Sequence, residues 1–393
     1  MNAASGRRLL MIEQGGRGGV ADYTTELVRG LAGEGWSIAL ATAADHLYPP
    51  IEGVAVRPVF HYMRDGTAIG RALRRHGLGK AVNGVRFLFS LPRLMLLARS
   101  ADIVHTQGWE IPQIGLAAIV CLRLAGTPVV QTSHGTFERA LSFVRTRRAV
   151  RLLSARLTAR TIVHTQADLD RIPSEVRGRA VVIPHGEYGG LARSGGSADR
   201  ESSRAALGIA ADAPVTLMFG QLRLDKGLGD LVEALRRLPS LHLLIGGQDA
   251  GGLAAVAAQL AEPRLAARVT VREGFLDMRE AARLFAATDT VALPYEAASQ
   301  SGVLLLAYGF GRPVIVYPVG GLAESVIDGE TGWVCARADA DALVSTLAAS
   351  IDAGWPESRR RGEAGARLAA ERFAWPAIAR RTGDLYREVL ADV

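Results

Sequence analysis

The sequence predicts an α/β protein built from two doubly wound parallel sheets. Short apolar runs of strand length alternate with stretches of helical periodicity along most of the chain, and strands separated by helices form parallel sheets that are covered on both faces. A length of 393 residues suits two or three domains. The composition, with 49% hydrophobic and 22% charged residues, excludes a disordered or fibrous chain.

The first half of the chain carries the elements of an N-terminal domain, which we assign to residues 1–190. A short strand at Arg8–Glu13 leads through a glycine turn into a helix at Val20–Ala32, whose apolar residues recur at helical spacing. Further strands are predicted at Trp36–Thr42, Ile103–His105, Val129–His134, Thr161–His164 and Val181–Pro184.

A polar segment of small residues from Gly189 to Ser203 lacks apolar periodicity and is predicted to be an interdomain linker. The alternation of strands and helices restarts beyond it, which indicates a second domain over residues 200–372. Its strands are predicted at Val215–Phe219, Leu241–Ile245, Val269–Val271, Thr290–Leu293 and Val314–Tyr317. Its helices are expected at Leu228–Arg237, Leu253–Ala261, 278–287 and Gly302–Gly309.

Several classes of protein are excluded by simple features of the sequence. No apolar run reaches the ~18 residues that a membrane span needs, the longest being Ile111 to Leu122. Residues Met1 to Glu13 carry no secretory signal. Cys121 and Cys335 are isolated in apolar segments and encode neither a disulfide framework nor a zinc site. We therefore expect a cytoplasmic protein of enzyme size.

The net charge of +7 is distributed unevenly along the chain. Residues 1–200 hold 26 Lys and Arg against 15 Asp and Glu, a net of +11, whereas residues 201–393 hold 20 against 24, a net of −4. Residues 66–160 alone hold 15 basic and three acidic residues. A basic half of this kind favours an anionic partner, whether nucleic acid, membrane lipid or a phosphorylated substrate.

Two glycine-rich loops point to phosphate-bearing ligands. Gly16 to Ala21, with Asp45 a little over twenty residues later, fits the dinucleotide-binding pattern of a dehydrogenase, although a plain tight turn explains it equally well. Gly220 to Gly227 follows a strand, opens a helix and contains Arg223 and Lys226. A guanidinium that pairs with two oxygens, beside an ammonium point charge, suits a diphosphate. The alternative is a solvated turn.

Two further loops follow predicted strands of the second half. The loop after Pro294 opens a helix near Gly302, whose N–H groups form an anion cradle together with the hydroxyls of Ser299 and Ser301. Val319 to Glu324 follows the next strand. Because open α/β sheets bind ligands at the carboxyl ends of their strands, a diphosphate-bearing ligand held mainly by the second domain is the leading hypothesis.

The order of these segments resembles that of the retaining glycosyltransferases of family 4, and the resemblance covers most of the chain. In the first half, Gly16 to Tyr23 is similar to the family's donor-facing glycine loop, Thr132 to Gly135 to its active-site histidine segment, and Ile183 to Gly186 to its entry into the hinge. In the second half the resemblance rests on Gly220–Gly227, Glu273–Leu276, Leu293–Tyr295, Gly320–Glu324, Asp328–Trp333 and Phe373–Ala379.

The resemblance implies the GT-B fold, in which two Rossmann-like domains face a cleft. Residues 1–190 would bind the acceptor, residues 200–372 the nucleotide-sugar, and a helix at 373–393 would return to the first domain. The implied reaction is a retaining transfer from a UDP- or GDP-sugar to a glycan, lipid-linked or other small hydroxyl acceptor, without a metal or cofactor. The implied catalytic residues are His134, Arg223 and Lys226. The implied donor-binding residues are Gly18, Gly19, Gly220, Glu296, Ser299, Gln300, Ser301, Gly302, Val303 and Glu324.

The chain departs from the family pattern at two places. The family usually places an arginine at or near the second residue after the glycine of the phosphate-binding loop, whereas here Gln221 and Leu222 intervene and Arg223 supplies the charge. The family also often has two glutamates at positions that hold Ala298 and Leu306 here, and Glu296 is only a near neighbour. These departures leave an alternative function, a catalytically weak or inactive nucleotide-sugar-binding subunit of a glycan-assembly complex.

The remaining motifs concern metals and surfaces. Asp168–Asp170 and Asp339–Asp341 match the Asp-x-Asp of metal-dependent glycosyltransferases, but both lie in polar, helix-prone segments and we expect no metal. Basic residues interleave with apolar ones over 71–99, and arginines gather over 145–160. Such segments suit an anionic membrane surface, the alternative being solvated helix faces. No nucleic-acid recognition pattern accompanies the charge, so we expect a protein at the inner face of the membrane rather than on nucleic acid.

Overall fold

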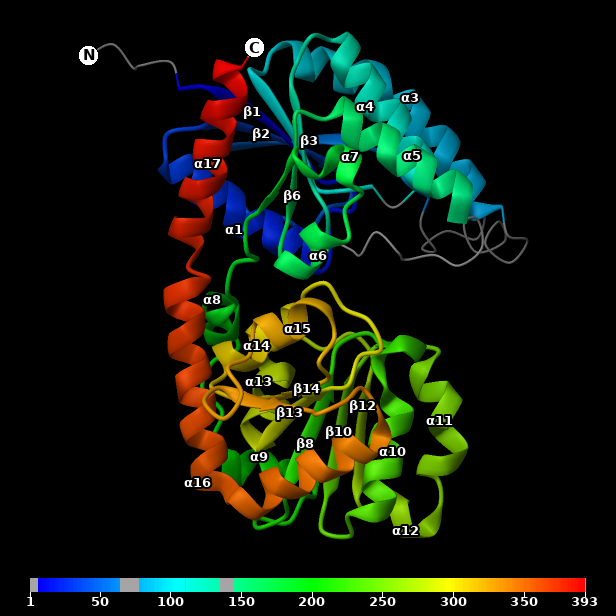
Figure 1. Ribbon diagram of the computed structural model, residues 1–393, viewed down its shortest axis with the longest axis vertical. Coiled ribbons are helices and arrows are strands. Elements are labelled where there is room, and N and C mark those ends of the chain that lie inside the picture. Colours follow the sequence, from blue (N-terminus) through cyan, green and yellow to red (C-terminus); the bar gives the residue numbers. More distant parts are fainter. Residues whose placement is uncertain (1–5, 64–77, 110, 135–143, 393) are drawn as a thin grey trace. The chain divides into compact units, whose positions relative to one another are not determined.

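The computed structural model describes residues 6–63, 78–109, 111–134 and 144–392, and the chain divides into two units. The first unit comprises Met1–Gly186 together with Trp375–Val393, and the second comprises Glu187–Ala374. Each unit is an α/β fold around a parallel sheet (Figure 1). The predicted fold class is therefore confirmed.

Seven parallel strands form the sheet of the first unit, in the order β3-β2-β1-β4-β5-β6-β7. They span Arg8–Ile12 (β1), Ser37–Ala43 (β2), Val54–Phe60 (β3), Ile103–Thr106 (β4), Val129–Thr132 (β5), Arg160–Val163 (β6) and Ala180–Val182 (β7). Almost every residue of β1, β4 and β5 is buried, as expected of central strands with both faces covered. Sequence reasoning missed the edge strand β3, whose first five residues are exposed or half-buried.

Helices cover both faces of this sheet. On one face α1 (Gly19–Gly33) packs against α17 (Trp375–Ala391), so the last helix belongs to the first unit. On the other face α3 (Gly79–Arg99) and α4 (Pro112–Leu124) bury Phe87 and Leu122 against the sheet. The remaining helices of the described part are α5 (Val144–Leu157), α6 (Gln166–Asp170) and α7 (Ser174–Arg177).

Six parallel strands form the main sheet of the second unit, in the order β12-β10-β8-β13-β14-β15. They span Val215–Phe219 (β8), His242–Gly247 (β10), Val269–Glu273 (β12), Thr290–Leu293 (β13), Val314–Val316 (β14) and Gly332–Val334 (β15), and β9 (Leu222–Arg223) pairs separately with β11 (Asp249–Ala250). In both main sheets the strand order reverses beside the first strand, between β1 and β4 and between β8 and β13. Open α/β sheets bind ligands at such a reversal.

The helices of the second unit also cover both faces of its sheet. One face is buried by α10 (Leu228–Arg237), α11 (Gly252–Leu260) and the first part of α16 (Ala340–Arg372), with the short α12 (Pro263–Ala266) beside them. The other face is buried by α13 (Met278–Ala287) and α14 (Gly302–Gly309). The short α15 (Gly320–Glu324) follows β14, and α16 is kinked at Gly354, where φ is 73°.

The prediction of a linker at 189–203 is wrong. This segment forms α8 (Gly189–Ser194) and the first half of α9 (Arg200–Leu207), and both helices belong to the second unit. Asp199 caps α9 by accepting a hydrogen bond from the Ser202 amide over 2.9 Å. The small residues of α8 serve close packing rather than flexibility, because a Cβ on Gly309 of α14 would lie 3.2 Å from both Gly189 and Ala192.

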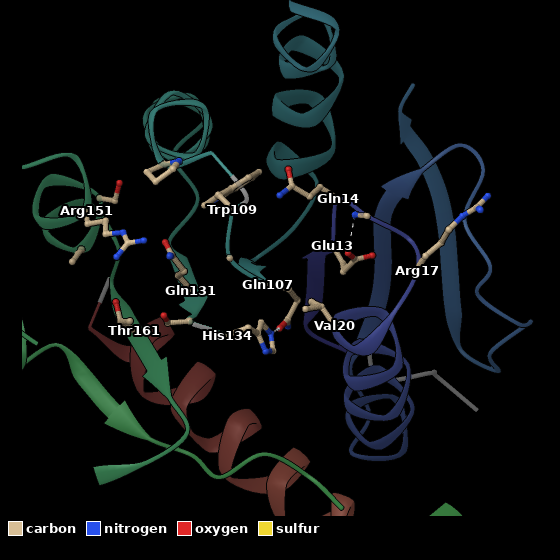
Figure 2. Close-up of a pocket in the computed structure, with 16 residues that line it drawn as sticks. Glu13, Gln14, Arg17, Val20, Gln107, Trp109, Gln131, His134, Arg151 and Thr161 are labelled. Atoms are coloured by element: carbon tan, nitrogen blue, oxygen red, sulfur yellow. Dashed lines mark hydrogen bonds between the residues drawn. The ribbon is translucent and has the colours of Figure 1, made fainter. Parts of the chain in front are cut away.

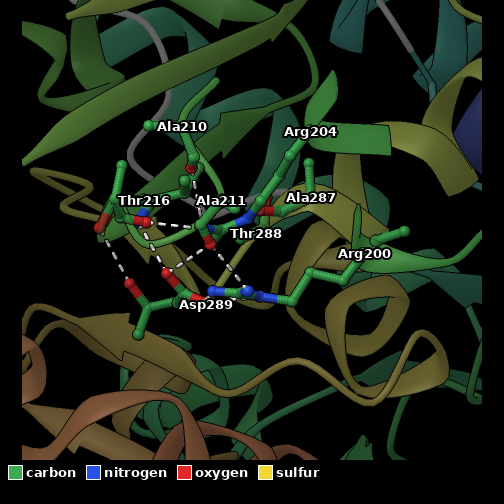
Figure 3. A network of polar contacts seen from close by, with 12 residues as sticks. Arg200, Arg204, Ala210, Ala211, Thr216, Ala287, Thr288 and Asp289 are labelled. Atoms are coloured by element: carbon green, nitrogen blue, oxygen red, sulfur yellow. Dashed lines mark hydrogen bonds and ion pairs between the residues drawn. The ribbon is translucent and has the colours of Figure 1, made fainter. Parts of the chain in front are cut away.

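A buried ion-pair network holds the amino ends of β8 and β13 (Figure 3). Arg204 of α9 is 1% exposed, and its guanidinium donates to the carbonyl oxygens of Ala211 and Ala213 at 2.8 Å and to Asp289 Oδ2 at 2.8 Å. Asp289 also pairs with Arg200 at 2.9 Å. The network lies at the amino edge of the sheet, opposite the loops that follow the strands, so it supports the fold rather than a ligand.

Candidate functional site

The loop Gly220–Gly227, here called the phosphate loop, leaves β8 where the strand order of the second unit reverses. Gly220 has φ 104° and Gly227 has φ 71°, values that favour glycine. Its packing is also close: a Cβ on Gly227 would collide with the carbonyl oxygen of Pro294, and a Cβ on Gly220 would lie 3.1 Å from Val303. The phosphate loop is therefore held against the segment 294–303, which follows β13.

This second segment ends at the amino terminus of α14. Ser301 caps the helix, since its Oγ accepts a hydrogen bond from the Leu304 amide at 3.3 Å. The N–H groups of Gly302 and Val303 lie in the first helical turn, where the helix dipole favours an anion. The Oε1 atom of Gln300 is buried and has no hydrogen-bond partner within the described structure.

The two cations of the phosphate loop have different partners. Lys226 Nζ lies 3.2 Å from the centroid of the Tyr295 ring, and the Tyr295 hydroxyl hydrogen-bonds the Ser301 side chain. Arg223 forms a two-pronged ion pair with Asp225, with Nε 2.8 Å from Oδ1 and Nη2 bonded to Oδ2. Burial raises the pKa of Tyr295 to about 12, so its hydroxyl stays neutral. Two cations, a helix amino end and a close glycine backbone are chemically suited to a diphosphate.

The structure gathers most of the residues predicted to bind the donor at this edge, and their roles stay predictions. Gathered there are Gly220, Arg223, Lys226, Glu296, Ser299, Gln300, Ser301, Gly302 and Val303. Glu324 is exposed at the end of α15, which is joined to the same segment by a 3.4 Å bond from the Gly321 amide to the Ala298 carbonyl. Ala298 and Leu306 are buried, so apolar side chains fill the positions of the family's usual glutamates.

Tyr295 lies between the lysine and the helix cap, and its ring face should keep Lys226 in place. We expect Tyr295→Leu to reduce the sugar transfer that the sequence predicts roughly 3- to 30-fold, the equivalent of one partly desolvated cation–π contact. Tyr295→Phe keeps the ring and should retain most of the activity. Initial rates with both variants, measured as kcat and KM for the donor, test this. Equal losses in the two variants would contradict a role for the ring.

A pocket of about 490 Å³ opens at the strand reversal of the first unit (Figure 2). Trp109 lines this pocket and packs so closely over Gly115 of α4 that a Cβ on Gly115 would collide with the indole. Side-chain amides, hydroxyls and one indole suit a hydroxyl-rich ligand. The lining residues are Glu13, Gln14, Gly15, Arg17, Val20, Gln107, Gly108, Trp109, Pro112, Gln131, Ser133, His134, Arg151, Ser154, Ala155 and Thr161.

The glycine loop of the first unit is built around a buried carboxylate that sequence reasoning missed. Glu13 is 4% exposed and accepts hydrogen bonds from the amides of Gly15 at 2.7 Å and Gly16 at 2.6 Å, and from the Tyr48 hydroxyl at 2.8 Å. The Gly15 and Gly16 amides thus donate to Glu13 and are not available to a pyrophosphate, and Asp45 pairs with Arg17 at 3.0 Å. Both features speak against the dehydrogenase interpretation. Gly18 and Gly19 lie beyond this carboxylate, and a Cβ on either would meet no atom within 4 Å.

His134 lines this pocket and follows the middle one of three neighbouring strands, β4, β5 and β6. Gln107 follows β4, His134 follows β5 and His164 follows β6, and these strands are neighbours in the sheet. His134 Nε2 is 2.8 Å from Gln107 Oε1, and His134 Nδ1 is 3.4 Å from His164 Nε2. Both ring nitrogens are therefore engaged with protein groups, and burial holds the pKa of His134 well below its usual value. This neutral ring is suited to hydrogen bonding rather than to proton transfer.

Three buried imidazoles and the half-buried ring of His134 should make the first unit sensitive to mild acid. Burial lowers the pKa of His164 to about 4 and those of His105 and His185 to about 3, while His134 shifts in the same direction. In the unfolded chain these groups take up protons near pH 6.5. The first unit therefore has its full free energy of unfolding above that pH. This free energy decreases as the pH falls towards 4, and at pH 6 each imidazole has lowered it by about 1 kcal/mol.

Amide hydrogen exchange of β4, β5 and β6, corrected for the intrinsic effect of pH, measures this loss. Protection should fall between pH 7 and 5.5 by more than it does in β8 and β13 of the second unit. Equal changes in the two units would contradict the assignment of the acid sensitivity to these imidazoles.

The two Asp-x-Asp motifs have ordinary structural partners. Asp168 Oδ2 accepts a hydrogen bond from Thr165 at 2.8 Å, Asp339 caps α16 through the Ala342 amide at 2.8 Å, and Asp341 pairs with Arg237 at 2.6 Å. Within the described residues, no group of three or more His, Cys, Asp or Glu side chains is arranged to hold a metal ion.

Comparisons with known proteins agree with this geometry. Residues 213–352 match the family model for glycosyl transferases group 1, and residues 18–186 match the glycosyl transferase 4-like domain. The D-inositol 3-phosphate glycosyltransferase of Xylanimonas cellulosilytica is 29% identical over 402 residues, which cover 95% of this chain and 92% of that protein. The same-named enzyme of Mycobacterium avium is 33% identical over 187 residues, 45% of this chain and 42% of that protein.

Two solved structures share the fold of the whole chain. Sucrose-phosphate synthase from Thermosynechococcus elongatus has a TM-score of 0.76 at 24% identity, and the match covers 98% of this chain and 100% of that one. Anabaena HepE, solved with UDP-glucose, has a TM-score of 0.74 at 18% identity, and the match covers 97% and 99% of the two chains.

Proposed function

Because this chain belongs to family 4 of the glycosyltransferases, whose members have the GT-B fold, we propose that it is a retaining, metal-independent enzyme using a UDP- or GDP-sugar. The observation that carries the proposal is the phosphate loop of the second unit. There Lys226 and Arg223 lie beside the amino end of α14 and beside Gly220, which has no side chain to cover its backbone. Such a site matches the charge of a nucleoside diphosphate.

The chemistry follows from where negative charge develops. When the sugar leaves its nucleotide, the departing diphosphate gains charge, and fixed cations and amides at that point lower the barrier. Lys226, Arg223 and the N–H groups of Gly302 and Val303 supply them. A retaining transfer on the front face of the sugar, with the leaving phosphate taking the acceptor proton, requires no carboxylate nucleophile. His134, held neutral, positions the side-chain amide of Gln107, which lines the pocket and can orient a hydroxyl group.

The acceptor is proposed to be hydroxyl-rich, either a glycan, a lipid-linked glycan or a small polyol. The pocket of about 490 Å³ in the first unit offers three side-chain amides, hydroxyls and an indole, a lining typical of sites for sugars and polyols. The relatives that match over 95% and 96% of this chain are D-inositol 3-phosphate glycosyltransferases, which supports an acceptor of polyol type.

The reaction itself is tested by incubating the protein with UDP-, GDP-, ADP- and TDP-sugars and a panel of polyol, glycan and lipid-linked acceptors. We expect transfer from a UDP- or GDP-sugar, a product whose anomeric configuration by NMR equals that of the donor, and rates unchanged by EDTA. An inverted product would contradict the retaining mechanism, and loss of activity in EDTA would contradict metal independence. Donor binding without transfer to any acceptor would favour the inactive subunit, the alternative that the buried Ala298 and Leu306 support.

We also propose that the first unit touches an anionic membrane, which would place the protein at the inner face of that membrane. Among the described residues, Ala81–Arg99 of α3 is long and apolar enough to cross a membrane by length and composition, and 22% of this stretch is buried. The expectation that no stretch is long enough does not hold for this helix, whose apolar residues are interrupted in the sequence by Arg86 and Arg93. Phe89 is 81% exposed and Leu96 65% exposed, so an apolar face beside two exposed arginines suits lipid headgroups.

Co-sedimentation with vesicles tests this surface. Binding should be stronger to phosphatidylglycerol than to phosphatidylcholine, should weaken with salt, and should fall in the double variant Arg86→Glu/Arg93→Glu. Absence of binding at low salt would contradict it. The predicted residues 71–77 lie outside the described part of the chain, as do the side chains of 145–148.

A further inference from the structure

The phosphate loop carries a carboxylate of its own, and that carboxylate already holds the arginine. Both oxygens of Asp225 bond to Arg223, one to Nε at 2.8 Å and the other to Nη2. This two-pronged pairing is the same one that guanidinium groups make with phosphate. Arg223 is thus already paired with an anion inside its own loop, and Lys226 lies on the ring of Tyr295.

We propose that Asp225 is an internal substitute for a phosphate group, which holds Arg223 while the site is empty and is exchanged for the diphosphate when the ligand binds. The inference rests on the proposed function, in which this loop takes a nucleoside diphosphate. Asp225 then lowers the affinity for the diphosphate product, because binding must break the Arg223–Asp225 pair and bring two anions together. The result is faster release of the product.

The exposure of the pair allows this exchange. The side chain of Arg223 is 25% exposed and that of Asp225 is 35% exposed, so the pair is partly solvated and separates at modest cost, unlike the fully buried Arg204. The backbone around it is fixed. The Asp225 carbonyl oxygen accepts a hydrogen bond from the Glu296 amide at 3.1 Å, and Gly227 packs on Pro294. The carboxylate can therefore change partner without movement of the loop.

The test is the Kd of UDP and of GDP, measured by calorimetry for the full chain and its variants. Asp225→Asn keeps the size of the side chain and removes its charge, and it should tighten binding about 2- to 5-fold. The same substitution in an Arg223→Met background should give a smaller gain, because it then removes only the repulsion between the two anions and releases no arginine. A matched control is Asp339→Asn, which removes the same charge from an Arg–Asp pair of equal spacing, Arg337 and Asp339, outside the phosphate loop.

The outcomes separate this inference from the proposed function. If the wild type binds UDP or GDP, Arg223→Met weakens binding, and Asp225→Asn binds equally or more weakly, then Asp225 orients the arginine and the inference is overturned alone. An equal gain in affinity for UDP or GDP in Asp339→Asn would also overturn the inference, since the gain would then come from the net charge of the protein. If neither the wild type nor any variant binds a nucleoside diphosphate, the proposed function falls and the inference falls with it.

Discussion

Lys226→Met should reduce transfer at least about 100-fold, the loss expected when one fixed group that stabilises transition-state charge is removed. Lys226 supplies a point charge at the phosphate loop, directly over Tyr295. Methionine keeps an unbranched apolar side chain of similar length, so the packing on the ring should survive. The fold should be unaffected because Lys226 is only half-buried.

Initial rates with the best donor, together with the melting temperature, check this result. The chain has only one other lysine, Lys80, so Lys80→Met is a control with the same chemical change, measured with a soluble acceptor. Turnover of Lys226→Met near that of Lys80→Met would rule out the phosphate loop as the site of charge stabilisation.

Asp289→Ala should destabilise the second unit by about 3–5 kcal/mol, the cost of leaving a buried charge without its partner. The Arg204 guanidinium is 1% exposed, and Asp289 is the carboxylate that pairs with it at 2.8 Å and with Arg200 at 2.9 Å. Asp289 also accepts a hydrogen bond from the Val215 amide at 2.8 Å, so the start of β8 loses an anchor as well.

Urea unfolding followed by tryptophan fluorescence measures this change. Asp341→Ala, which removes an exposed partner of Arg237, is the matched control and should cost less than about 1 kcal/mol. Similar midpoints for the two variants would mean that the Arg204–Asp289 pair contributes no more than a surface ion pair does.

Much of the fold was predictable because its signals are local. Short runs rich in apolar residues, such as Val215–Phe219 and Thr290–Leu293, are buried strands, and they stand out without knowledge of their neighbours. The edge strand β3 was missed because its exposed positions and Pro58 give no such signal. The segment 189–203 was misread because small residues serve close packing as well as flexible linkers, and the sequence alone does not distinguish the two.

In the candidate site, too, the residues with local sequence signals were predictable and their partners were not. Glycines, two cations and a serine cap lie in short segments after strands, so the phosphate loop and the start of α14 were predictable. The partners of these groups were not: Asp225 binds Arg223, Tyr295 holds Lys226, and Glu13 binds its glycine loop, and each depends on the direction of a side chain. Likewise, Gln107 and His164 meet His134 only because β4, β5 and β6 are neighbours in the sheet.

The most direct test of the central claim, that the phosphate loop and α14 hold a nucleoside diphosphate, is a thermal-shift measurement with UDP, GDP, ADP and TDP. A ligand that binds only the folded protein raises its apparent melting temperature with concentration. We predict a rise with UDP or GDP in the wild type and its loss in Lys226→Met. No shift with any of the four at millimolar concentration, or an equal shift in the variant, would contradict the claim.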